Sequence, residues 1–394
     1  MANEEIQLET IPHGKLGIIG MDNCSQLSGM VDHYMVKWRS TRQQLHPNDI
    51  AFKGYQRDTY LVKHKCDRFG NGEAKGTIAE SVRGDDIFII ADVTNHSMTY
   101  NVSGYTNHYS PDDHYQDIKR IIAAIGGKAK RINVIMPFLY ESRQHRRSSR
   151  ESLDCALMLQ ELINMGVENI ITFDAHDPRV QNAIPLSGFE SVQCAYQFIK
   201  AICHNVDDLI FDNEHMMIIS PDEGGTNRAV YLANVLGINM GMFYKRRDYS
   251  RIVNGRNPIV AHEFLGQDVA DKDVFIIDDM ISSGESMIDV ATELKKRKAK
   301  RIFVVSTFGL FANGLEMFDK AVESGIINKV FTTNAIYQPP ELLERDYYVS
   351  CDMSKYIAYI IDTLNHDTSL SDLLNPYDKI HSIVGRYMNG EFKR

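Results

Sequence analysis

Cysteine and positive charge are both scarce in this sequence. Its six cysteines lie far apart with no CxxC pair, so the sequence indicates neither a zinc site nor a disulfide framework. We expect free, mostly buried thiols. The 43 lysines and arginines face 52 acidic residues, and the formal net charge is −9. This balance disfavours broad binding to nucleic acid or to anionic membranes, because such binding needs a dominant positive surface.

Long apolar runs are also missing. No stretch approaches the ~18 consecutive apolar residues of a membrane span, and the first ten residues, MANEEIQLET, are acidic without an apolar core. We therefore expect a cytoplasmic protein with no membrane and no nucleic-acid partner. At 394 residues, 43% of them hydrophobic, the chain is long enough for two domains with their own cores.

From about residue 86 onward, short β-branched runs alternate with longer segments of helical period, which is typical of a parallel sheet covered by helices. The predicted strands are 87–92, 132–136, 169–173, 216–220, 239–243, 274–278, 301–306 and 329–333. The predicted helices are 113–125, 151–165, 191–203, 225–235, 285–297 and 353–364.

These strands are too many for one small sheet, and the segment NAIPLSGFE (182–190) indicates a loop between two successive α/β sets. We therefore predict two α/β domains, residues 1–188 and 189–394, each with a central and mostly parallel sheet. The last helices are then free to pack back on the N-terminal domain.

Residues 95–117 are predicted to form an insertion or lid. The segment contains His96, His108 and His114, but their spacing fits no familiar metal-ligand pattern. We favour a polar surface loop over a metal site. The adjoining amphipathic stretch DDHYQDIKRIIAAIGG fits either a core helix or an interface helix, and we favour the core.

The stretch FIIDDMISSGES (275–286) carries the strongest chemical signal. Asp278 and Asp279 follow a buried strand, where ligands of open α/β sheets bind. Backbone N–H groups at the start of the next helix favour a phosphate, and Gly284 lets the chain approach it closely. The added hydroxyl groups are those of Ser282, Ser283 and Ser286.

Two acids about a sugar's length from a phosphate site suggest ribose 5-phosphate, with its 2′- and 3′-hydroxyls on the carboxylates. The chain lacks a GxxxxGK[ST] nucleotide loop. The alternative is an ordinary N-capped helix with both aspartates solvated.

These residues carry a family resemblance. VFIIDDMISSGES is similar to the phosphoribosyl diphosphate binding motif of type I phosphoribosyltransferases and of ribose-phosphate diphosphokinases, the phosphoribosyl diphosphate synthetases. Further blocks resemble the synthetases in their order along the chain, and simple transferases lack the first two: RFGNGEAKGTIAESVRGDDIFII (68–90), INVIMPFLYESRQHRR (132–147), FDAHDPRVQ (173–181), SPDEGGTNRA (220–229) and FYKRRD (243–248).

The resemblance implies two phosphoribosyltransferase-type (type I) domains with the active site between them. The reaction would move the β,γ-diphosphate of ATP, the co-substrate, onto the C1 hydroxyl of ribose 5-phosphate, giving 5-phosphoribosyl 1-diphosphate and AMP for nucleotide biosynthesis. Lys245 and Arg247, assisted by Arg246 and Arg251, correspond to flexible-loop cations that would stabilise the transferring group. Without the other blocks, a basic surface loop would be the simpler interpretation.

The resemblance also implies the ligands of Mg²⁺ and of ATP. His176, also a catalytic candidate, and Asp222 match the Mg²⁺ and substrate-phosphate ligands, although a lone histidine after a strand is commonly structural. The residues that match adenine and ATP-phosphate contacts are Phe69, Asn71, Glu73, Arg143, Gln144 and His145.

Three departures bear on this assignment. His145 and Asn71 stand where the family commonly has aspartate, and the loop containing Ser282 is closer to that of a transferase. We therefore expect nucleotide and sugar preference to differ from the family more readily than the reaction does. The chain is also longer than usual for the family at the N-terminus, in residues 95–117 and after residue 337.

The family assembles into dimers and hexamers, in which the adenine segment reaches a neighbouring subunit's site, so a homo-oligomer is expected. Two alternatives stay open: a diphosphokinase for a modified ribose phosphate, and a catalytically silent regulatory homologue. The retained Lys245, Arg247, His176 and Asp222 favour an active enzyme, because a mere binder needs no charge-neutralising loop.

Overall fold

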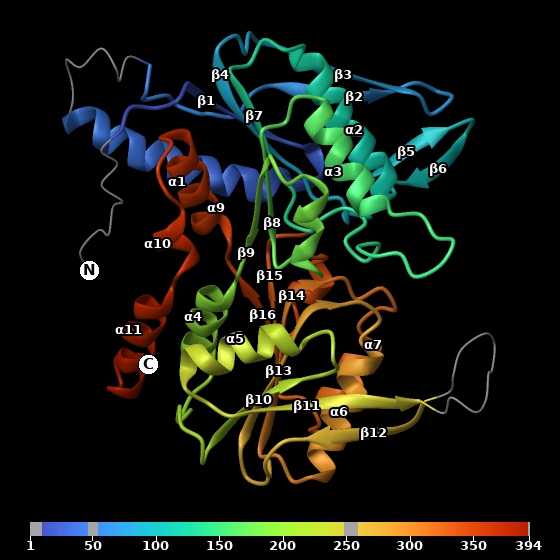
Figure 1. Ribbon diagram of the computed structural model, residues 1–394, viewed down its shortest axis with the longest axis vertical. Coiled ribbons are helices and arrows are strands. Elements are labelled where there is room, and N and C mark those ends of the chain that lie inside the picture. Colours follow the sequence, from blue (N-terminus) through green and yellow to red (C-terminus); the bar gives the residue numbers. More distant parts are fainter. Residues whose placement is uncertain (1–9, 46–53, 248–258, 393–394) are drawn as a thin grey trace. The chain divides into compact units, whose positions relative to one another are not determined.

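The computed structural model describes residues 10–45, 54–247 and 259–392, and the chain divides into two compact units (Figure 1). Unit 1 contains Met1–Gln193, Asn334–Tyr337 and Asp352–Asn375. Unit 2 contains Cys194–Thr333, Gln338–Cys351 and Pro376–Arg394. Neither unit is one continuous segment, because two later stretches of the chain return to unit 1.

Unit 1 is built on a five-stranded parallel sheet in the order β1-β4-β7-β8-β9. Its strands are β1 (Lys15–Gly20), β4 (Asp85–Ile90), β7 (Arg131–Ile135), β8 (Asn169–Phe173) and β9 (Gly188–Val192). Every residue of β4 and β7 is buried, as expected for parallel strands covered on both faces.

The described part of unit 1 also contains five α-helices and two hairpins. The helices are α1 (Ser25–Leu45), α2 (Pro111–Ile125), α3 (Asp154–Asn164), α9 (Ser354–Asn365) and α10 (Ser371–Leu374). One hairpin joins β2 (His64–Arg68) to β3 (Ala74–Ile78), and the other joins β5 (Thr99–Val102) to β6 (Tyr105–His108). Both hairpins lie beside α2 in Figure 1.

Helix α2 shows why the local sequence folds as it does. Ser110 caps its first turn through a reciprocal hydrogen-bonded pair with Asp113, Pro111 occupies the first turn, and Gly126 ends the helix in the left-handed region. Its apolar side is buried, with Ile118, Ile121, Ile122 and Ile125 in the core. The preference for a core helix is therefore confirmed.

Unit 2 is built on a seven-stranded sheet in the order β12-β11-β10-β13-β14-β15-β16, in which only the β11–β12 pair is antiparallel. Its strands are β10 (Met216–Ser220), β11 (Met240–Arg247), β12 (Ile259–Leu265), β13 (Asp273–Ile281), β14 (Arg301–Gly309), β15 (Lys329–Thr333) and β16 (Tyr348–Cys351). Its helices are α4 (Ala195–Asn205), α5 (Thr226–Leu236), α6 (Glu285–Lys296), α7 (Glu316–Glu323), α8 (Pro340–Leu343) and α11 (Tyr377–Met388).

The predicted α/β class with mostly parallel sheets is confirmed, and each predicted strand and helix is present. The bounds of β8, β10 and β15 agree with the prediction, and the other elements are shifted at one end or both. One local prediction is wrong: residues 188–190 belong to β9, which pairs with β8, and not to a loop. The sequence concealed this strand because GFESV is only partly buried at the sheet edge and has no apolar run. The domain boundary after residue 188 stays a prediction.

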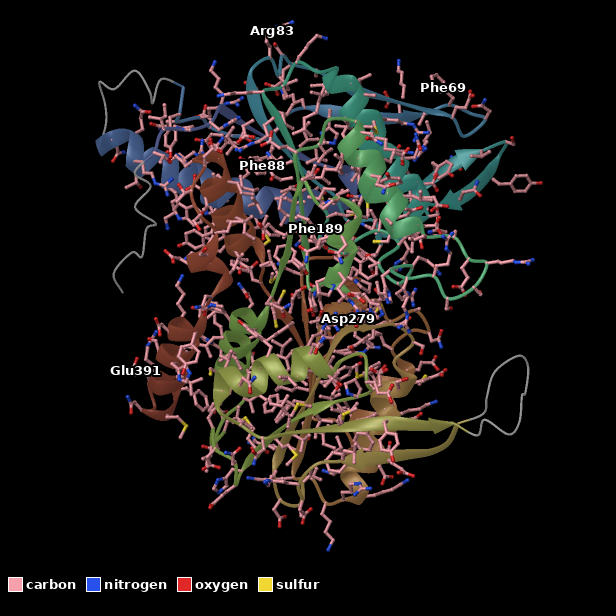
Figure 2. All side chains as sticks on the ribbon, in the orientation of Figure 1. Phe69, Arg83, Phe88, Phe189, Asp279 and Glu391 are labelled. Carbon is pink, nitrogen blue, oxygen red and sulfur yellow. The ribbon has the colours of Figure 1, made fainter. Side chains whose placement is uncertain are left out.

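The cysteines are free, and all except Cys66 are buried, as expected from the sequence. Figure 2 shows how densely side chains fill the sheets and helices, with Phe88 and Phe189 labelled on two of the strands of unit 1. No helix within residues 10–45, 54–247 and 259–392 is long and apolar enough to cross a membrane.

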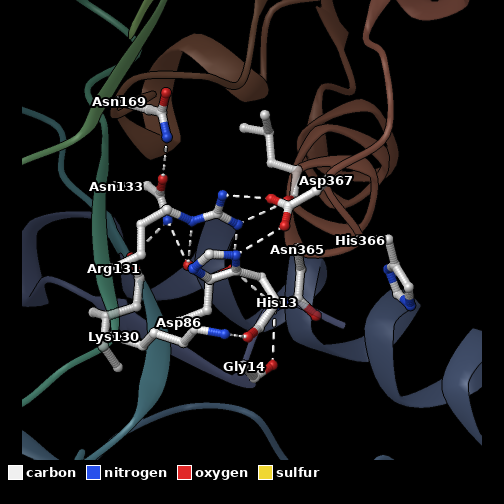
Figure 3. Close-up of polar contacts among 12 residues, drawn as sticks. His13, Gly14, Asp86, Lys130, Arg131, Asn133, Asn169, Asn365, His366 and Asp367 are labelled. Atoms are coloured by element: carbon white, nitrogen blue, oxygen red, sulfur yellow. Dashed lines mark hydrogen bonds and ion pairs between the residues drawn. The ribbon is translucent and has the colours of Figure 1, made fainter. Parts of the chain in front are cut away.

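A buried polar network ties the end of α9 to the sheet of unit 1 (Figure 3). The Asp86 carboxylate is fully buried and accepts hydrogen bonds from Arg131 Nε at 2.9 Å and Nη2 at 2.7 Å. Asn133 and Asn365 also donate to it, at 2.9 and 2.8 Å. Arg131 in turn donates to Asp367 and to the Leu364 carbonyl, each at 2.7 Å.

We predict that Arg131→Met destabilises unit 1, because it leaves the Asp86 carboxylate buried without its ion partner. Breaking a buried pair in this way lowers the free energy of unfolding by roughly 3–5 kcal/mol. Denaturant titration followed by tryptophan fluorescence measures the loss, since Trp38 is the single tryptophan of the sequence and lies in unit 1.

Lys119→Met is the matched control. Its 2.9 Å ion pair with Glu161 lies at the surface of unit 1, where such pairs contribute roughly 1 kcal/mol or less. Equal shifts of the unfolding midpoint in the two variants would contradict the role given to the Arg131–Asp86 pair.

Candidate active site

Strands β10 and β13 are parallel neighbours at the centre of the unit 2 sheet. From β10 the chain continues to β11 on one side, and from β13 it continues to β14 on the other. The sheet order therefore reverses between these two strands. Ligands of open α/β sheets bind beyond the carboxyl ends of the strands at such a point, and both predicted loops of unit 2 begin there.

The two adjacent acids lie at this edge. β13 runs to Ile281, further than predicted, because Met280 and Ile281 pair with Phe308 and Gly309 of β14. Asp278 and Asp279 therefore lie within the last part of the strand, with Asp279 buried at 3% exposure. Figure 2 labels Asp279 within unit 2.

Electrostatic crowding at this acidic pair is severe. Burial raises the pKa of Asp278 well above its ordinary value of 3.8, and the neighbouring charges of Asp279 and then Asp222 raise it further. The backbone N–H of Asp279 donates to Asp278 Oδ1 at 2.8 Å, which opposes the rise only in part. A site of this kind favours a cation or a hydroxyl-rich ligand that donates hydrogen bonds to the carboxylates.

Arg228 supplies one partial counter-charge that the sequence had not assigned. Its guanidinium on α5 lies 3.8 Å from Asp279 Oδ2, and both side chains are largely buried. Sequence reasoning quoted Arg228 within SPDEGGTNRA but gave it no role. The signal was available, because Arg228 lies in the first turn of the helix that follows the Asp222 loop.

The loop after β10 is organised around Asp222. Its carboxylate oxygen Oδ1 accepts hydrogen bonds from the N–H groups of Gly224 at 2.8 Å and Gly225 at 3.2 Å. A Cβ on Gly225 would lie 3.0 Å from Ser220 Oγ and 3.3 Å from the Ile277 carbonyl. The absence of a side chain at Gly225 therefore lets the Asp222 loop lie against β13.

The loop after β13 leads into α6 through Gly284. This residue has φ of 90° and caps the helix without a side-chain hydrogen bond. A Cβ there would meet the Phe318 ring at 2.4 Å, so both the backbone angle and the packing require glycine. Ser282, Ser283 and Ser286 surround the helix start, which is the geometry that favours an anion.

In unit 1, the loops that follow the neighbouring strands β7 and β8 bring predicted residues together. The rings of His145 and His176 have centroids 5.3 Å apart. His145 Nε2 lies 3.6 Å from Asp177 Oδ2, and its buried Nδ1 has no hydrogen-bond partner. Arg143 is exposed in the same loop as His145. The predicted metal ligand His176 and the predicted ATP residue His145 thus belong to one cluster.

Two side chains of this cluster, His145 and Asp177, have shifted pKa values. Burial lowers the pKa of His145 below its ordinary value, although Asp177 opposes the shift. Hydrogen bonds from Arg179 lower the pKa of Asp177 to about 2. Asp177 is thus ionised while burial favours a neutral His145 imidazole, which offers a ring nitrogen as an acceptor or ligand.

The predicted adenine residues occupy the turn of the β2–β3 hairpin. Asn71 Nδ2 donates to Glu73 Oε2 at 2.8 Å, and the Phe69 N–H donates to the Glu73 carbonyl at 2.6 Å. Phe69 is 49% exposed at the outer end of the hairpin (Figure 2). In the described part of the chain, this turn makes no hydrogen bond to Arg143, Gln144 or His145.

Lys245 and Arg247 lie on β11, where their backbones pair with His262 and Ile259 of β12. Their side chains and that of Arg246 lie outside the described part of the structure, as does Arg251.

Within the described residues, no group of three or more His, Cys, Asp or Glu side chains could hold a metal ion by itself. His114, which had tempted a metal interpretation, has its ring nitrogens within hydrogen-bonding distance of Asn23 at 3.0 Å and of the Asn95 carbonyl at 2.7 Å. A metal ion with one or two protein ligands and substrate oxygens stays compatible with this geometry.

Two family models match most of the chain. Residues 16–166 match the N-terminal domain of ribose phosphate pyrophosphokinase, and residues 190–345 match the phosphoribosyl transferase domain.

Relatives named ribose-phosphate pyrophosphokinase match over much of their length. The protein of Vibrio cholerae is 28% identical over 313 residues, which cover 78% of this chain and 90% of the relative. That of Mycoplasmopsis pulmonis is 26% identical over 315 residues, covering 78% of this chain and 88% of the relative. A crystal structure of phosphoribosylpyrophosphate synthetase from Mycobacterium smegmatis shares the fold, with a TM-score of 0.69 at 20% identity. The match covers 90% of this chain and 99% of that one.

We predict that Asp278→Asn stabilises unit 2 at neutral pH. The raised pKa means that the folded protein binds this proton more tightly than the unfolded chain, so stability falls as the pH rises through the folded pKa. Removing the charge recovers that loss, and each kcal/mol recovered raises the melting temperature by roughly 2–4 °C. Calorimetric scans at pH 7.5 and at about pH 4 measure the difference, which should shrink at the lower pH.

The control for this change is Asp268→Asn, an exposed aspartate of the same unit. It should leave the melting temperature nearly unchanged at both pH values. A lower melting temperature for Asp278→Asn than for wild type at pH 7.5 would contradict the electrostatic penalty assigned to Asp278.

Proposed function

Because this chain belongs to the ribose-phosphate pyrophosphokinase family, we propose that it transfers the β,γ-diphosphate of ATP to the C1 hydroxyl of ribose 5-phosphate. The products are 5-phosphoribosyl 1-diphosphate and AMP, for nucleotide biosynthesis. In this reaction the C1 oxygen forms a bond to the β-phosphorus of ATP, while the bond from that phosphorus to the AMP oxygen breaks. The C1 hydroxyl gives up its proton.

One observation carries this proposal. Two adjacent carboxylates, Asp278 and Asp279, lie close in the chain to the start of α6, at the point where the strand order of the unit 2 sheet reverses. Asp278 and Asp279 would accept hydrogen bonds from the ribose 2′- and 3′-hydroxyls. The N–H groups and hydroxyls around Ser282, Ser283, Gly284 and Ser286 would hold the 5-phosphate. Ribose 5-phosphate would thus place its neutral sugar ring at the two carboxylates and its anionic phosphate at the start of the helix.

ATP would be held by unit 1. We propose that Phe69 stacks on the adenine while Asn71 and Glu73 contact its edge. Arg143, Gln144 and His145 would bind the triphosphate and the base. The cluster of His145 with His176 supports this assignment, because it links an ATP residue to a metal ligand.

Mg²⁺ fits as a partner shared with the nucleotide. The described residues offer no complete protein cage, and magnesium commonly takes one or two protein ligands with phosphate oxygens and water. His176 of unit 1 and Asp222 of unit 2 are the proposed Mg²⁺ ligands, each assigned from its own motif. The ion would neutralise charge on the phosphate oxygens.

Lys245 and Arg247 would stabilise the charge that develops on the transferring group, assisted by Arg246 and Arg251. Attack at a β-phosphorus surrounded by charged oxygens depends mainly on alignment and charge neutralisation. Because this proposal depends on side chains outside the described residues, it is carried by the sequence alone. A homo-oligomer and a cytoplasmic location also stay predictions.

We expect wild-type protein to form AMP from ATP only when ribose 5-phosphate and Mg²⁺ are both present. Lys245→Ala should lower kcat by about 10²-fold, the loss typical of removing a charge-stabilising group. Chromatographic measurement of AMP together with 5-phosphoribosyl 1-diphosphate tests this. Lys296→Ala, an exposed lysine on α6, is the control and should retain wild-type activity.

No AMP from folded, ATP-binding wild-type protein would overturn the proposed reaction. It would move the assignment to a modified ribose phosphate as acceptor or to a silent regulatory homologue.

We also predict that Asp278→Asn raises the KM for ribose 5-phosphate by about 10- to 100-fold, as expected for weakening hydrogen bonds to a charged acceptor. The KM for ATP should change far less, because the nucleotide is assigned to other residues. Steady-state kinetics with each substrate varied in turn measures the two values. An equal rise in both would contradict the separate assignment of sugar and nucleotide.

A further inference from the structure

The β5–β6 hairpin is joined directly to the turn that carries the proposed adenine residues. The N–H of Ser103, at the β5–β6 turn, donates to the Gly70 carbonyl at 3.0 Å. Gly72 has φ of 91°, and a Cβ there would lie 3.1 Å from Val102 Cγ2. The two turns are therefore in contact through backbone and side chains, and Figure 1 shows the hairpins adjacent at one end of unit 1.

The same insertion also holds the base of the adenine turn. The guanidinium of Arg68, the residue before Phe69, lies over the rings of Tyr100 at 4.9 Å and Tyr109 at 4.7 Å. Its Nε donates to Tyr109 Oη at 3.2 Å, and its Nη2 donates to Asp117 at 3.0 Å. Two aromatic rings from residues 95–117 thus fix the residue that precedes Phe69.

Two large aromatic side chains remain exposed at these joined turns. Phe69 is 49% exposed and Tyr105 is 76% exposed. Tyr105 is next but one to Ser103, and Phe69 is next to Gly70, so the hydrogen bond between the turns brings the chain segments of both rings together. Exposed aromatic rings provide stacking surface at little conformational cost, because few side-chain torsions have to be ordered.

We propose that the β5–β6 hairpin forms a second wall of the nucleotide-base site, with Tyr105 contacting the bound adenine and the Arg68 contacts positioning the Phe69 turn. This inference rests on the proposed function, and it deepens that function by adding a base-contacting residue from the insertion. Because the two turns are joined, Tyr105 accompanies Phe69 to the nucleotide, whichever subunit completes the site. A base that stacks on one ring at this end of the unit therefore meets both hairpins.

The first test is the kinetics of Tyr105→Ala. We expect the KM for ATP to rise roughly two- to tenfold, the range that an aromatic contact gives, with kcat and the KM for ribose 5-phosphate nearly unchanged. Tyr105→Phe keeps the ring and should recover most of the loss. Tyr377→Ala is the control, since Tyr377 is an exposed tyrosine of unit 2. An unchanged KM for ATP in Tyr105→Ala would overturn the proposal.

The second test needs no turnover. Tyr105→Trp adds one exposed indole to a protein whose single tryptophan, Trp38, is 7% exposed and stacked on Tyr359. Titration with ATP in the absence of ribose 5-phosphate should change the added emission saturably, while wild-type emission and titration with ribose 5-phosphate alone should show little change. A flat ATP titration would contradict direct contact with the base.

The two tests separate this inference from the proposed reaction. Wild-type protein that forms no AMP but gives a saturable ATP signal in Tyr105→Trp would refute the reaction and support the base wall. Active wild-type protein with a flat titration and an unchanged KM in Tyr105→Ala would support the reaction and refute the base wall.

Discussion

Burial of carboxylates in parallel sheets is the constraint on which both units depend. An ionised carboxylate at the end of a buried strand must find donors or a counter-charge, or it takes up a proton. In unit 1, Asp86 is matched by Arg131, Asn133 and Asn365 (Figure 3). Because Asn365 belongs to α9, satisfying this one charge joins the late segment Asp352–Asn375 to a sheet made earlier in the chain. A fully satisfied network of this kind fixes a specific arrangement as well as lowering its energy.

At the carboxyl end of β4, the buried carboxylate has hydrogen bonds but no arginine partner among the contacts described. Asp92 follows β4 and is fully buried, and burial raises its pKa to about 6 in spite of hydrogen bonds from Thr94 and from the Tyr337 N–H at 2.6 Å. In unit 2, Arg228 lies 3.8 Å from Asp279, and burial together with the charges of Asp279 and Asp222 raises the pKa of Asp278 well above its ordinary value. Asp86, at the start of β4, is thus paired with an arginine, whereas Asp92 and Asp278, at the carboxyl ends of β4 and β13, have raised pKa values. A raised carboxyl pKa lowers stability at neutral pH, and the hydroxyl groups of a bound sugar would donate further hydrogen bonds to the carboxylates in unit 2.

The sequence predicted what depends on local pattern. Buried strands such as β8, β10 and β15 are short runs of mainly apolar and β-branched residues, and their predicted ends agree with the structure. The acid pair, Gly284 and the α6 start also follow from adjacent residues, because strand, turn and helix succeed one another within a short stretch. The strand β9 and the hairpins did not follow, since they are partly exposed and their pairing depends on distant partners. The side chains of Lys245 and Arg247 lie outside the described structure, so their role stays a prediction.

Contacts between residues far apart in the sequence explain why the insertion was hard to interpret. Residues 95–117 contain three histidines, four tyrosines and three serines, which suggest a polar lid. In the structure, Tyr100 and Tyr109 pack on Arg68, and His114 lies buried against Asn23. Neither contact follows from spacing in the sequence. Arg68 and Tyr100 belong to different hairpins, and Asn23 precedes α1 whereas His114 belongs to α2. The contacts of Tyr100 and Tyr109 join the insertion to the residue that precedes Phe69. A segment without a counterpart in the family motifs is in this way coupled to the residues that do match them, and nucleotide binding is where its effect should appear.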